Sequence, residues 1–298
     1  MFSIVVTSRD SGPRVGKALR SVQSQLYPAW QVILVEHGAE GTSRPHARPY
    51  ERSFGPNLQS HWLPGASRAA AVAEGVARAN GQFLLVLRAE DELLPLTLQH
   101  FSCRFRSAPR ASACFGRAIL RADADELRPS EERAPMRGDV VASTLERRLA
   151  IESAALAWRR CDLPAADGLG ERWPGLEHIE LLLRLEKDRT LAAITEDLAI
   201  VSADGSAATA DGSWRRFTRM HADRIRQRIG SAGLDAVRAA GERDLARACW
   251  RAGQQRRAFA HFDRASRLAP NAPHSAWLFR YLQARLWFRR PARLRVAG

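Results

Sequence analysis

The stretch Gln82–Pro95, Gln-Phe-Leu-Leu-Val-Leu-Arg-Ala-Glu-Asp-Glu-Leu-Leu-Pro, decides the fold. Its apolar run Phe83–Leu87 predicts a strand that is buried on both faces of a parallel sheet. Three carboxylates follow at once, at Glu90, Asp91 and Glu92. Ligands of open α/β sheets bind at the carboxyl ends of strands, and neighbouring carboxylates there suit a divalent cation that carries a substrate phosphate. An acidic cap on the helix that begins near Pro95 is the alternative interpretation.

The composition is that of a globular protein with one large domain, or with one domain and a smaller one. Hydrophobic residues make up 45% of the 298 residues, which argues against disorder. The sequence has no run of 18 apolar residues, so we expect no membrane span. The N-terminus is typical of a first strand, not of a signal peptide. The four cysteines lack C-x-x-C spacing, so we expect a reducing compartment and no zinc.

The net charge of +14 belongs entirely to the C-terminal segment. Residues 211–298 carry 20 Arg and 6 acidic residues, whereas residues 1–210 carry 26 basic and 26 acidic residues. The composition becomes small and polar around 202–213, which predicts a linker. We therefore predict two domains, 1–210 and a basic helical module over 211–298.

The first domain alternates strand and helix patterns, as expected of a mainly parallel sheet with helices on both faces. Val15, Leu19, Val22 and Leu26 predict one apolar face of a helix over 14–26. Residues 38–57 are rich in Gly, Ser, Pro and Arg and predict a long loop. Strands are expected near 3–6, 30–35, 61, 83–87, 111–120, 154–158 and 190–194, and further helices over 67–79 and 176–186.

Four helices are predicted in the basic module, over 214–230, 234–251, 255–268 and 274–288. Ala258, Phe262, Ala265 and Pro270 have the spacing of a tetratricopeptide repeat. A single repeat does not bury its own face, so we interpret this part as a helical hairpin that resembles the repeat.

Arginine and aromatic residues occur together in the module, in segments 214–217, 277–281 and 286–290. This combination suits an anionic membrane surface or a protein partner. The alternative is a solvated Arg-rich face whose aromatic residues form a core. A sequence pI near 11 also suits nucleic acid, but no nucleic-acid-binding motif is present, so nucleic acid is not an expected partner.

Several segments follow the order and spacing of one known family. They are Val5–Asp10, Ala18–Gln25, Val35–Ala39, Val86–Asp91, Ala113–Ala118 and Glu177–Leu185. Over roughly residues 2–205 the chain resembles a family 2 glycosyltransferase. The resemblance implies the GT-A fold, an α/β architecture with a mainly parallel sheet and helices on both faces, to which the C-terminal all-α segment is added.

The resemblance also implies an activity. A sugar would pass from a nucleotide-sugar donor to a saccharide or lipid-linked acceptor, with inversion at the anomeric carbon, in bacterial surface-polysaccharide synthesis. The protein would then be cytoplasmic, with peripheral attachment to the inner face of the membrane as an option. A catalytically degenerate member that acts as a scaffold or regulatory partner is the alternative.

The resemblance assigns roles to individual residues. Thr7, Arg9, Glu36 and His37 would hold the nucleoside. Asp91 and Glu90 would bind a divalent cation, Mn²⁺ or Mg²⁺, that carries the diphosphate, with Arg88 beside it. His178 or Glu177, or alternatively Glu180, would remove the proton of the acceptor hydroxyl. Such a base makes the weakly nucleophilic hydroxyl attack, and a cation neutralises the leaving diphosphate.

This chain departs from the family's pattern at several of these positions. Arg88 replaces the first acid of the carboxylate motif, Glu36-His37 replaces a pair of aspartates, Val72-Ala73 replaces an Arg-Asn pair, and His178 replaces the expected aspartate base.

Two of these departures have open alternatives. Arg88 either forms an ion pair that blocks a cation or neutralises the diphosphate directly. His178 is either a base or a core histidine packed in a stripe with Leu182 and Leu185.

Overall fold

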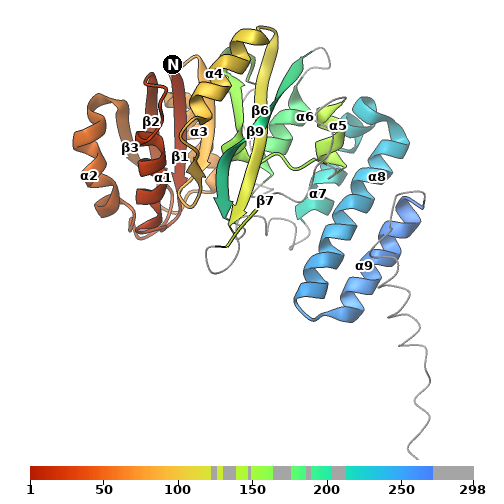
Figure 1. Cartoon of the computed structure of the whole chain (residues 1–298). Helices are drawn as coiled ribbons and strands as arrows, with labels where there is room; N and C mark the ends of the chain where they lie inside the picture. Colours follow the sequence, from red (N-terminus) through yellow and green to blue (C-terminus); the bar gives the residue numbers. More distant parts are fainter. Residues whose placement is uncertain are drawn as a thin grey trace, which may run out of the picture. The chain divides into compact units, whose positions relative to one another are not determined.

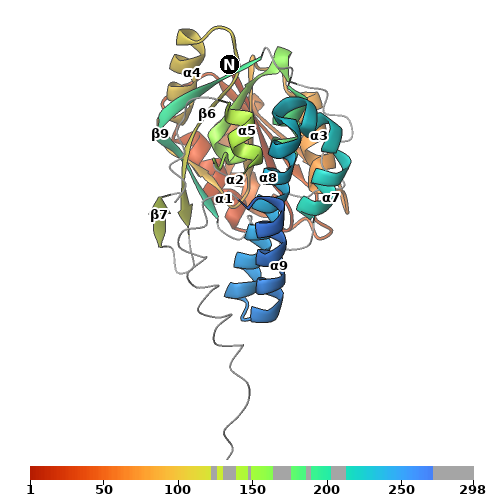
Figure 2. The same cartoon turned by 90° about the vertical axis from the view of Figure 1, so that its right-hand side faces the viewer.

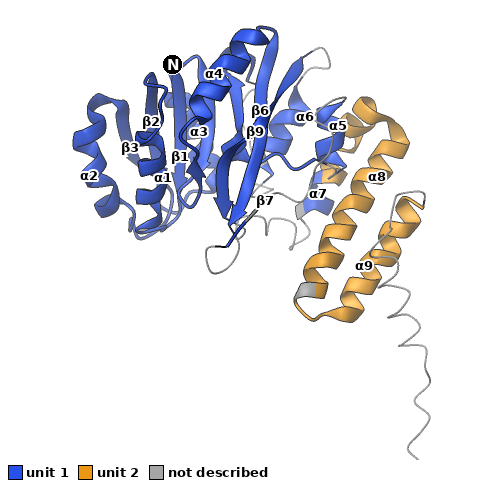
Figure 3. Ribbon diagram, in the orientation of Figure 1, with its two compact units in different colours: residues 1–217 blue, residues 218–298 orange. Residues whose placement is uncertain are grey.

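The computed structural model describes residues 1–121, 126–129, 139–146, 149–163, 176–185, 189–202 and 213–270. The chain divides into two compact units, residues 1–217 and 218–298 (Figure 3). The boundary lies later than the 210/211 position expected from composition, within helix α7 (Ser213–Met220). Trp214 and Phe217 of α7 are buried and stack with their ring centroids 5.4 Å apart.

A mixed sheet forms the centre of unit 1 (Figure 1). The strands run in the spatial order β3-β2-β1-β4-β8-β6-β9-β5, and β7 pairs with β6. Their bounds are β1 (Phe2–Ser8), β2 (Trp30–Glu36), β3 (Leu58–Trp62), β4 (Phe83–Arg88), β5 (Glu92–Leu93), β6 (Ala111–Arg121), β7 (Leu127–Pro129), β8 (Leu156–Arg159) and β9 (Thr190–Ser202). Strands β3, β2, β1 and β4 are parallel, whereas β8 is antiparallel to both β4 and β6.

Helices cover both faces of this sheet, as the two views in Figures 1 and 2 show. They are α1 (Arg14–Gln23), α2 (Arg44–Phe54), α3 (Arg68–Arg78), α4 (Thr97–Ser107), α5 (Val140–Leu145) and α6 (Glu177–Arg184). Successive strand residues point to opposite faces, so Ile4 and Val6 of β1 pack in one core with α1, α2 and α4. Val5 packs in a second core with α3, α5 and α6.

The predicted loop over 38–57 is wrong, because it contains α2. Pro45 lies in the first turn of α2, where a missing N–H is tolerated. Phe54 at the other end is buried, and its ring meets Trp30 edge-on with centroids 4.9 Å apart. Tertiary packing thus overrides a composition that is typical of loops.

The predicted helix over 14–26 is too long. α1 ends at Gln23, and the side chain of Leu26 is 70% exposed. The apolar face of α1 therefore ends at Val22. Leu26 lies beyond the helix, and its N–H donates to the Pro95 carbonyl oxygen at 3.2 Å.

Unit 2 contains helices α8 (Ala222–Arg251) and α9 (Gln255–Leu268). α8 kinks at Gly230, whose φ of 78° lies in the left-handed region, near the predicted break between two helices. Glu242 of α8 and His261 of α9 are 2.9 Å apart. The predicted helix over 255–268 is confirmed, the one over 274–288 lies outside the described residues, and the likeness to a tetratricopeptide repeat stays a prediction. Within the described ranges, no helix has both the length and the apolar character to cross a bilayer.

Close packing of α3 on β1 depends on Gly75. A Cβ at this position would lie 2.2 Å from Cγ1 of Val5. Gly75→Ala should therefore lower the free energy of unfolding by about 1–3 kcal/mol, because added volume strains a packed core. In α1, a Cβ at Gly16 would meet only the Tyr50 hydroxyl at 3.8 Å, so Gly16→Ala should stabilise by up to about 1 kcal/mol. Urea unfolding of both variants measures this, and equal effects of the same sign would contradict it.

Candidate active site

The parallel register of β1, β2 and β4 brings their carboxyl ends together. Ser8 of β1 pairs with Glu36 of β2, and Thr7 pairs with Arg88 of β4. Arg9 and His37 follow these strands directly. The residues that the sequence assigns to the nucleoside and to the carboxylate motif thus lie along one edge of the sheet, as expected for parallel strands.

Glu36 is buried and fixes the start of α2. One carboxylate oxygen accepts the Ser43 N–H at 2.8 Å, and the Ser43 hydroxyl lies 2.6 Å from that of Ser8. The other oxygen, Oε2, is buried and has no hydrogen-bond partner in the described part of the chain. Thr7 is also buried, and its carbonyl oxygen accepts the Ala89 N–H at 2.9 Å. Glu36 therefore fixes the loop after β2 through one carboxylate oxygen, while Oε2 remains able to accept a hydrogen bond.

The surroundings of His37 lower the pKa of its imidazole. Burial is the main factor that lowers its pKa, and the nearby guanidinium groups of Arg9 and Arg68 lower it further. The hydrogen bond between Nδ1 and the Ala66 carbonyl oxygen, 3.2 Å long, and the carboxylate of Asp10 act in the opposite direction. Two arginines are thus close to His37 at the ends of β1 and β2.

Asp10 connects the loop after β1 to the loop after β2. Its carboxylate oxygens accept the N–H groups of Ala39 at 3.2 Å and Glu40 at 3.0 Å. Asp10 has a φ of 47°, a left-handed conformation that Asp tolerates better than most residues. A Cβ at Gly38 would lie 2.1 Å from Oδ1 of Asp10, so this connection needs glycine at position 38.

Arg88 and Asp91 form a buried bidentate ion pair. Arg88 Nε and Nη2 each donate to an Asp91 oxygen at 2.7 Å, and the Asp91 side chain is 1% exposed. The pair also binds the backbone of Ser202, the last residue of β9. The Ser202 N–H donates to Asp91 at 3.0 Å, and the Ser202 carbonyl oxygen accepts from Arg88 Nη2 at 3.1 Å. Burial alone would lower the pKa of Arg88, but its hydrogen bonds to Asp91 and the charges of Asp91, Glu90 and Glu152 raise that pKa.

These contacts do not fit the metal-binding role that the resemblance gives to Asp91 and Glu90. Both Asp91 oxygens already accept hydrogen bonds, and Glu90 lies 3.8 Å from Arg88 Nη1. Among the described residues, no group of three or more His, Cys, Asp or Glu side chains could hold a metal ion. Of the two alternatives for Arg88, the geometry favours the ion pair that blocks a cation. A requirement for Mn²⁺ or Mg²⁺ stays a prediction.

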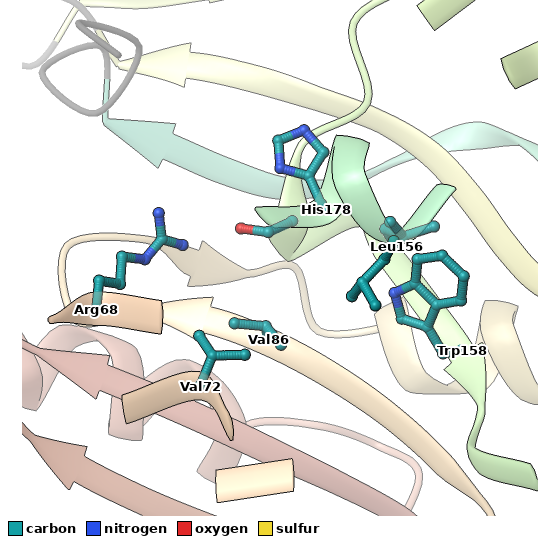
Figure 4. Close-up of a pocket in the computed structure, with 8 residues that line it drawn as sticks. Arg68, Val72, Val86, Leu156, Trp158 and His178 are labelled. Carbon is teal, nitrogen blue, oxygen red and sulfur yellow. The ribbon is translucent and has the colours of Figure 1, made fainter. Parts of the chain in front are cut away.

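A pocket lies between helices α3 and α6 and strands β4 and β8 (Figure 4). The strand-end residues that the resemblance assigned to the donor and the cation do not line it: Thr7, Arg9, Glu36, His37, Arg88, Glu90 and Asp91. It is lined by Arg68 and Val72 of α3, Val86 of β4, Leu156 and Trp158 of β8, His178 of α6, and by Ser153 and Leu181. In the figure, Arg68 and His178 rise from different helices to the same side of Val72 and Val86. The pocket therefore combines apolar side chains with two polar groups. The Arg68 guanidinium can bind an anionic ligand, and the His178 ring can accept a proton from a ligand.

His178 lies in this pocket and is only partly buried, whereas Leu182 and Leu185 are buried. This placement favours the base over the packed core histidine. Glu180 is buried and is paired with Arg184 at 2.7 Å. Glu177 begins α6, but its side chain lies outside the described ones.

The sequence profile of glycosyl transferase family 2 matches residues 3–163, which is more than half of the chain. The chain belongs to this family. The sequence of this family 2 member is 29% identical to O-antigen biosynthesis protein RfbC of Myxococcus xanthus over 261 residues. That alignment covers 85% of the chain but 18% of RfbC, so the chain spans about a fifth of the relative's length.

Solved structures of TarS from S. aureus share the fold. The crystal structure of TarS 1-349 has a TM-score of 0.59 at 13% identity and covers 90% of this chain and 82% of TarS 1-349. Its complex with UDP-GlcNAc has a TM-score of 0.61 at 12% identity, with the same coverage. The predicted GT-A fold is thereby confirmed, and the structure contains the C-terminal helical segment that the sequence predicted.

Several residues of the site were missed by sequence reasoning. Arg68 and Trp158 line the pocket, and Asp10 ties two loops together. The only available signal for Arg68 was its position one helical turn before Val72, where the family has an arginine.

The ion pair leads to a stability prediction. Asp91→Ala should lower the free energy of unfolding by about 3–5 kcal/mol, because it leaves the Arg88 guanidinium buried and without its counter-ion. The matched change Glu90→Ala removes a longer, partly exposed contact and should cost less than about 1 kcal/mol. Urea denaturation of the full chain measures both, and an Asp91→Ala protein as stable as the parent would contradict the structural role.

The lowered pKa of His37 leads to a pH prediction. The unfolded chain binds a proton at His37 at higher pH than the folded chain, so the stability that His37 contributes is lost as pH falls below about 6.5. Replacing it by Gln should flatten the decline of stability between about pH 7 and pH 5. Thermal unfolding over this range tests the difference, with His46→Gln on the exposed side of α2 as the control. Parallel curves for parent and His37→Gln would contradict it.

Proposed function

We propose that this chain transfers a sugar from a nucleoside-diphosphate sugar to a saccharide or lipid-linked acceptor in bacterial surface-polysaccharide synthesis, with inversion at the anomeric carbon. Family membership supports the transferase class. The name of the RfbC relative supports the biosynthetic setting, and the TarS complex with UDP-GlcNAc supports a donor of this class. The observation that carries the proposal is the pocket between α3, α6, β4 and β8 with His178 in its wall.

The chemistry follows from the position of His178. A ring nitrogen of His178 accepts the proton of an acceptor hydroxyl, and the oxygen then attacks the anomeric carbon from the side opposite the leaving group. The bond between that carbon and the phosphate oxygen breaks, and its electron pair leaves with the diphosphate. A positioned base is needed because a hydroxyl is a weak nucleophile at neutral pH.

A second candidate function is supported by the ion pair. Asp91 is fully engaged by Arg88 and Ser202, and Val72-Ala73 replaces a common Arg-Asn pair. These two features are what a degenerate family member would show if it served as a scaffold or regulatory partner. Calorimetric titration with a panel of nucleotide-sugars separates the two functions, because a scaffold of this kind would bind none of them.

Docking through residues 211–298 stays a proposal for the basic module. In segment 214–217, Trp214 and Phe217 are both buried, so for these two residues the alternative of aromatic core residues holds. The segments 277–281 and 286–290 lie outside the described residues. An anionic membrane at the cytoplasmic face, or a protein partner, therefore rests on the surplus of arginine in this module.

The role of His178 can be tested with the donor alone, since water replaces the acceptor in slow donor hydrolysis. His178→Ala should slow release of the nucleoside diphosphate by about 10²–10⁴-fold, the usual contribution of a general base. Donor affinity should stay unchanged, which calorimetry measures on the same protein. His46→Ala is the control because His46 is exposed on α2. Equal hydrolysis rates for both variants would remove His178 from the mechanism.

A further inference from the structure

The leaving diphosphate of the proposed reaction needs positive charge nearby, and this inference rests on that proposed function. Negative charge accumulates on the diphosphate as the bond to the sugar breaks. The carboxylates at the end of β4 do not fit a cation that would neutralise it, because both Asp91 oxygens accept hydrogen bonds. Arg88 does not supply the charge either, since its guanidinium binds Asp91 and Ser202 and also faces Glu90.

Arginines outside the carboxylate motif can supply this charge instead. Arg68 is the first residue of α3, directly after the N-cap Ser67, whose hydroxyl accepts the Ala70 N–H at 3.1 Å. The N-terminus of this helix carries partial positive charge that favours an anion. Arg68 also lines the pocket together with His178, so it extends to where donor and base would meet (Figure 4).

Arg9 adds to this charge from the end of β1. Arg9 is exposed, and the positive charges of Arg9 and Arg68 both act on His37 at the end of β2. Arg9 thus adds a guanidinium at the end of β1 to the one that Arg68 supplies in the first turn of α3, with the carboxylate of Asp10 also close to His37.

Arg68 also has a clear relation to the position that the family pattern would fill with arginine. That position is Val72 here, one helical turn after Arg68 and in the wall of the same pocket. Residues four apart lie on one face of a helix. The chain has therefore placed a guanidinium one turn closer to the helix N-terminus, where the helix dipole adds to its effect.

We propose that Arg68, together with Arg9 and the N-terminus of α3, binds the diphosphate of the donor, and that donor binding requires no divalent cation. When the sugar leaves, the electron pair of the broken bond stays on the diphosphate oxygen, which these groups stabilise. Asp91 then acts as a structural residue that holds Arg88 and β9 in place.

The experiment is calorimetric titration of the full chain with UDP, GDP, dTDP and ADP, each in EDTA and in MnCl₂. We expect a nucleoside diphosphate that binds equally well in both solutions. Arg68→Gln should weaken this binding about tenfold or more, the effect of losing a charged hydrogen bond. Arg68→Lys should restore part of it. The matched control is Arg78→Gln at the other end of α3, where Arg78 pairs with Glu74.

Binding of the corresponding nucleoside without phosphates provides the second measurement. Arg68→Gln should leave it unchanged, which separates a lost phosphate contact from a damaged fold. Binding that occurs only with Mn²⁺ and is abolished by Asp91→Asn would overturn this inference while leaving the proposed function intact. If no nucleoside diphosphate bound in either solution, the proposed function itself would fail.

Discussion

A buried ion pair between Arg88 and Asp91 determines how the end of the sheet is used. A guanidinium and a carboxylate each lose several kcal/mol of hydration on burial, a loss that is offset only when their hydrogen bonds are well placed. Here the two side chains satisfy each other and also bind the backbone of Ser202. Strands β4 and β9 are thereby joined at their carboxyl ends, although they are far apart in sequence.

This pair redistributes charge within the site. In the family pattern the carboxylate motif is negative and attracts a cation, whereas here one of its acids is neutralised by an arginine from the preceding strand. Two further arginines, Arg9 and Arg68, lie near His37 together with the carboxylate of Asp10. The same fold can thus receive an anionic ligand with a different arrangement of charged groups, as expected when function depends on the site more than on the architecture.

Much of this fold follows from its sequence because local signals agree with the tertiary structure. The apolar run at Phe83–Leu87 became β4, and the pattern over 67–79 became α3 with Ser67 as its N-cap. The predictions failed where packing overrode local composition. The Pro and Arg content of α2 is typical of a loop, but the packing of Phe54 on Trp30 holds this segment as a helix.

The candidate site was less predictable than the fold. The register of the parallel strands pairs Thr7 with Arg88 and Ser8 with Glu36 along one edge of the sheet, so this placement was expected. The direction of the Arg88 side chain was not, because one residue type can either bind a ligand or neutralise a neighbour. Arg68 and Trp158 line the pocket because of where α3 and β8 lie in the fold, and no local sequence motif indicates that position.

The contact between Asp10 and Gly38 has a consequence for how this protein can change over time. Any side chain at position 38 would overlap the Asp10 carboxylate, and Asp10 in turn fixes the backbone of Ala39 and Glu40. A side chain at position 38 is therefore compatible only with a moved Asp10 carboxylate, which would give up its hydrogen bonds, or with a smaller residue at position 10. Laboratory evolution of this edge of the sheet would therefore need libraries that vary both codons at once.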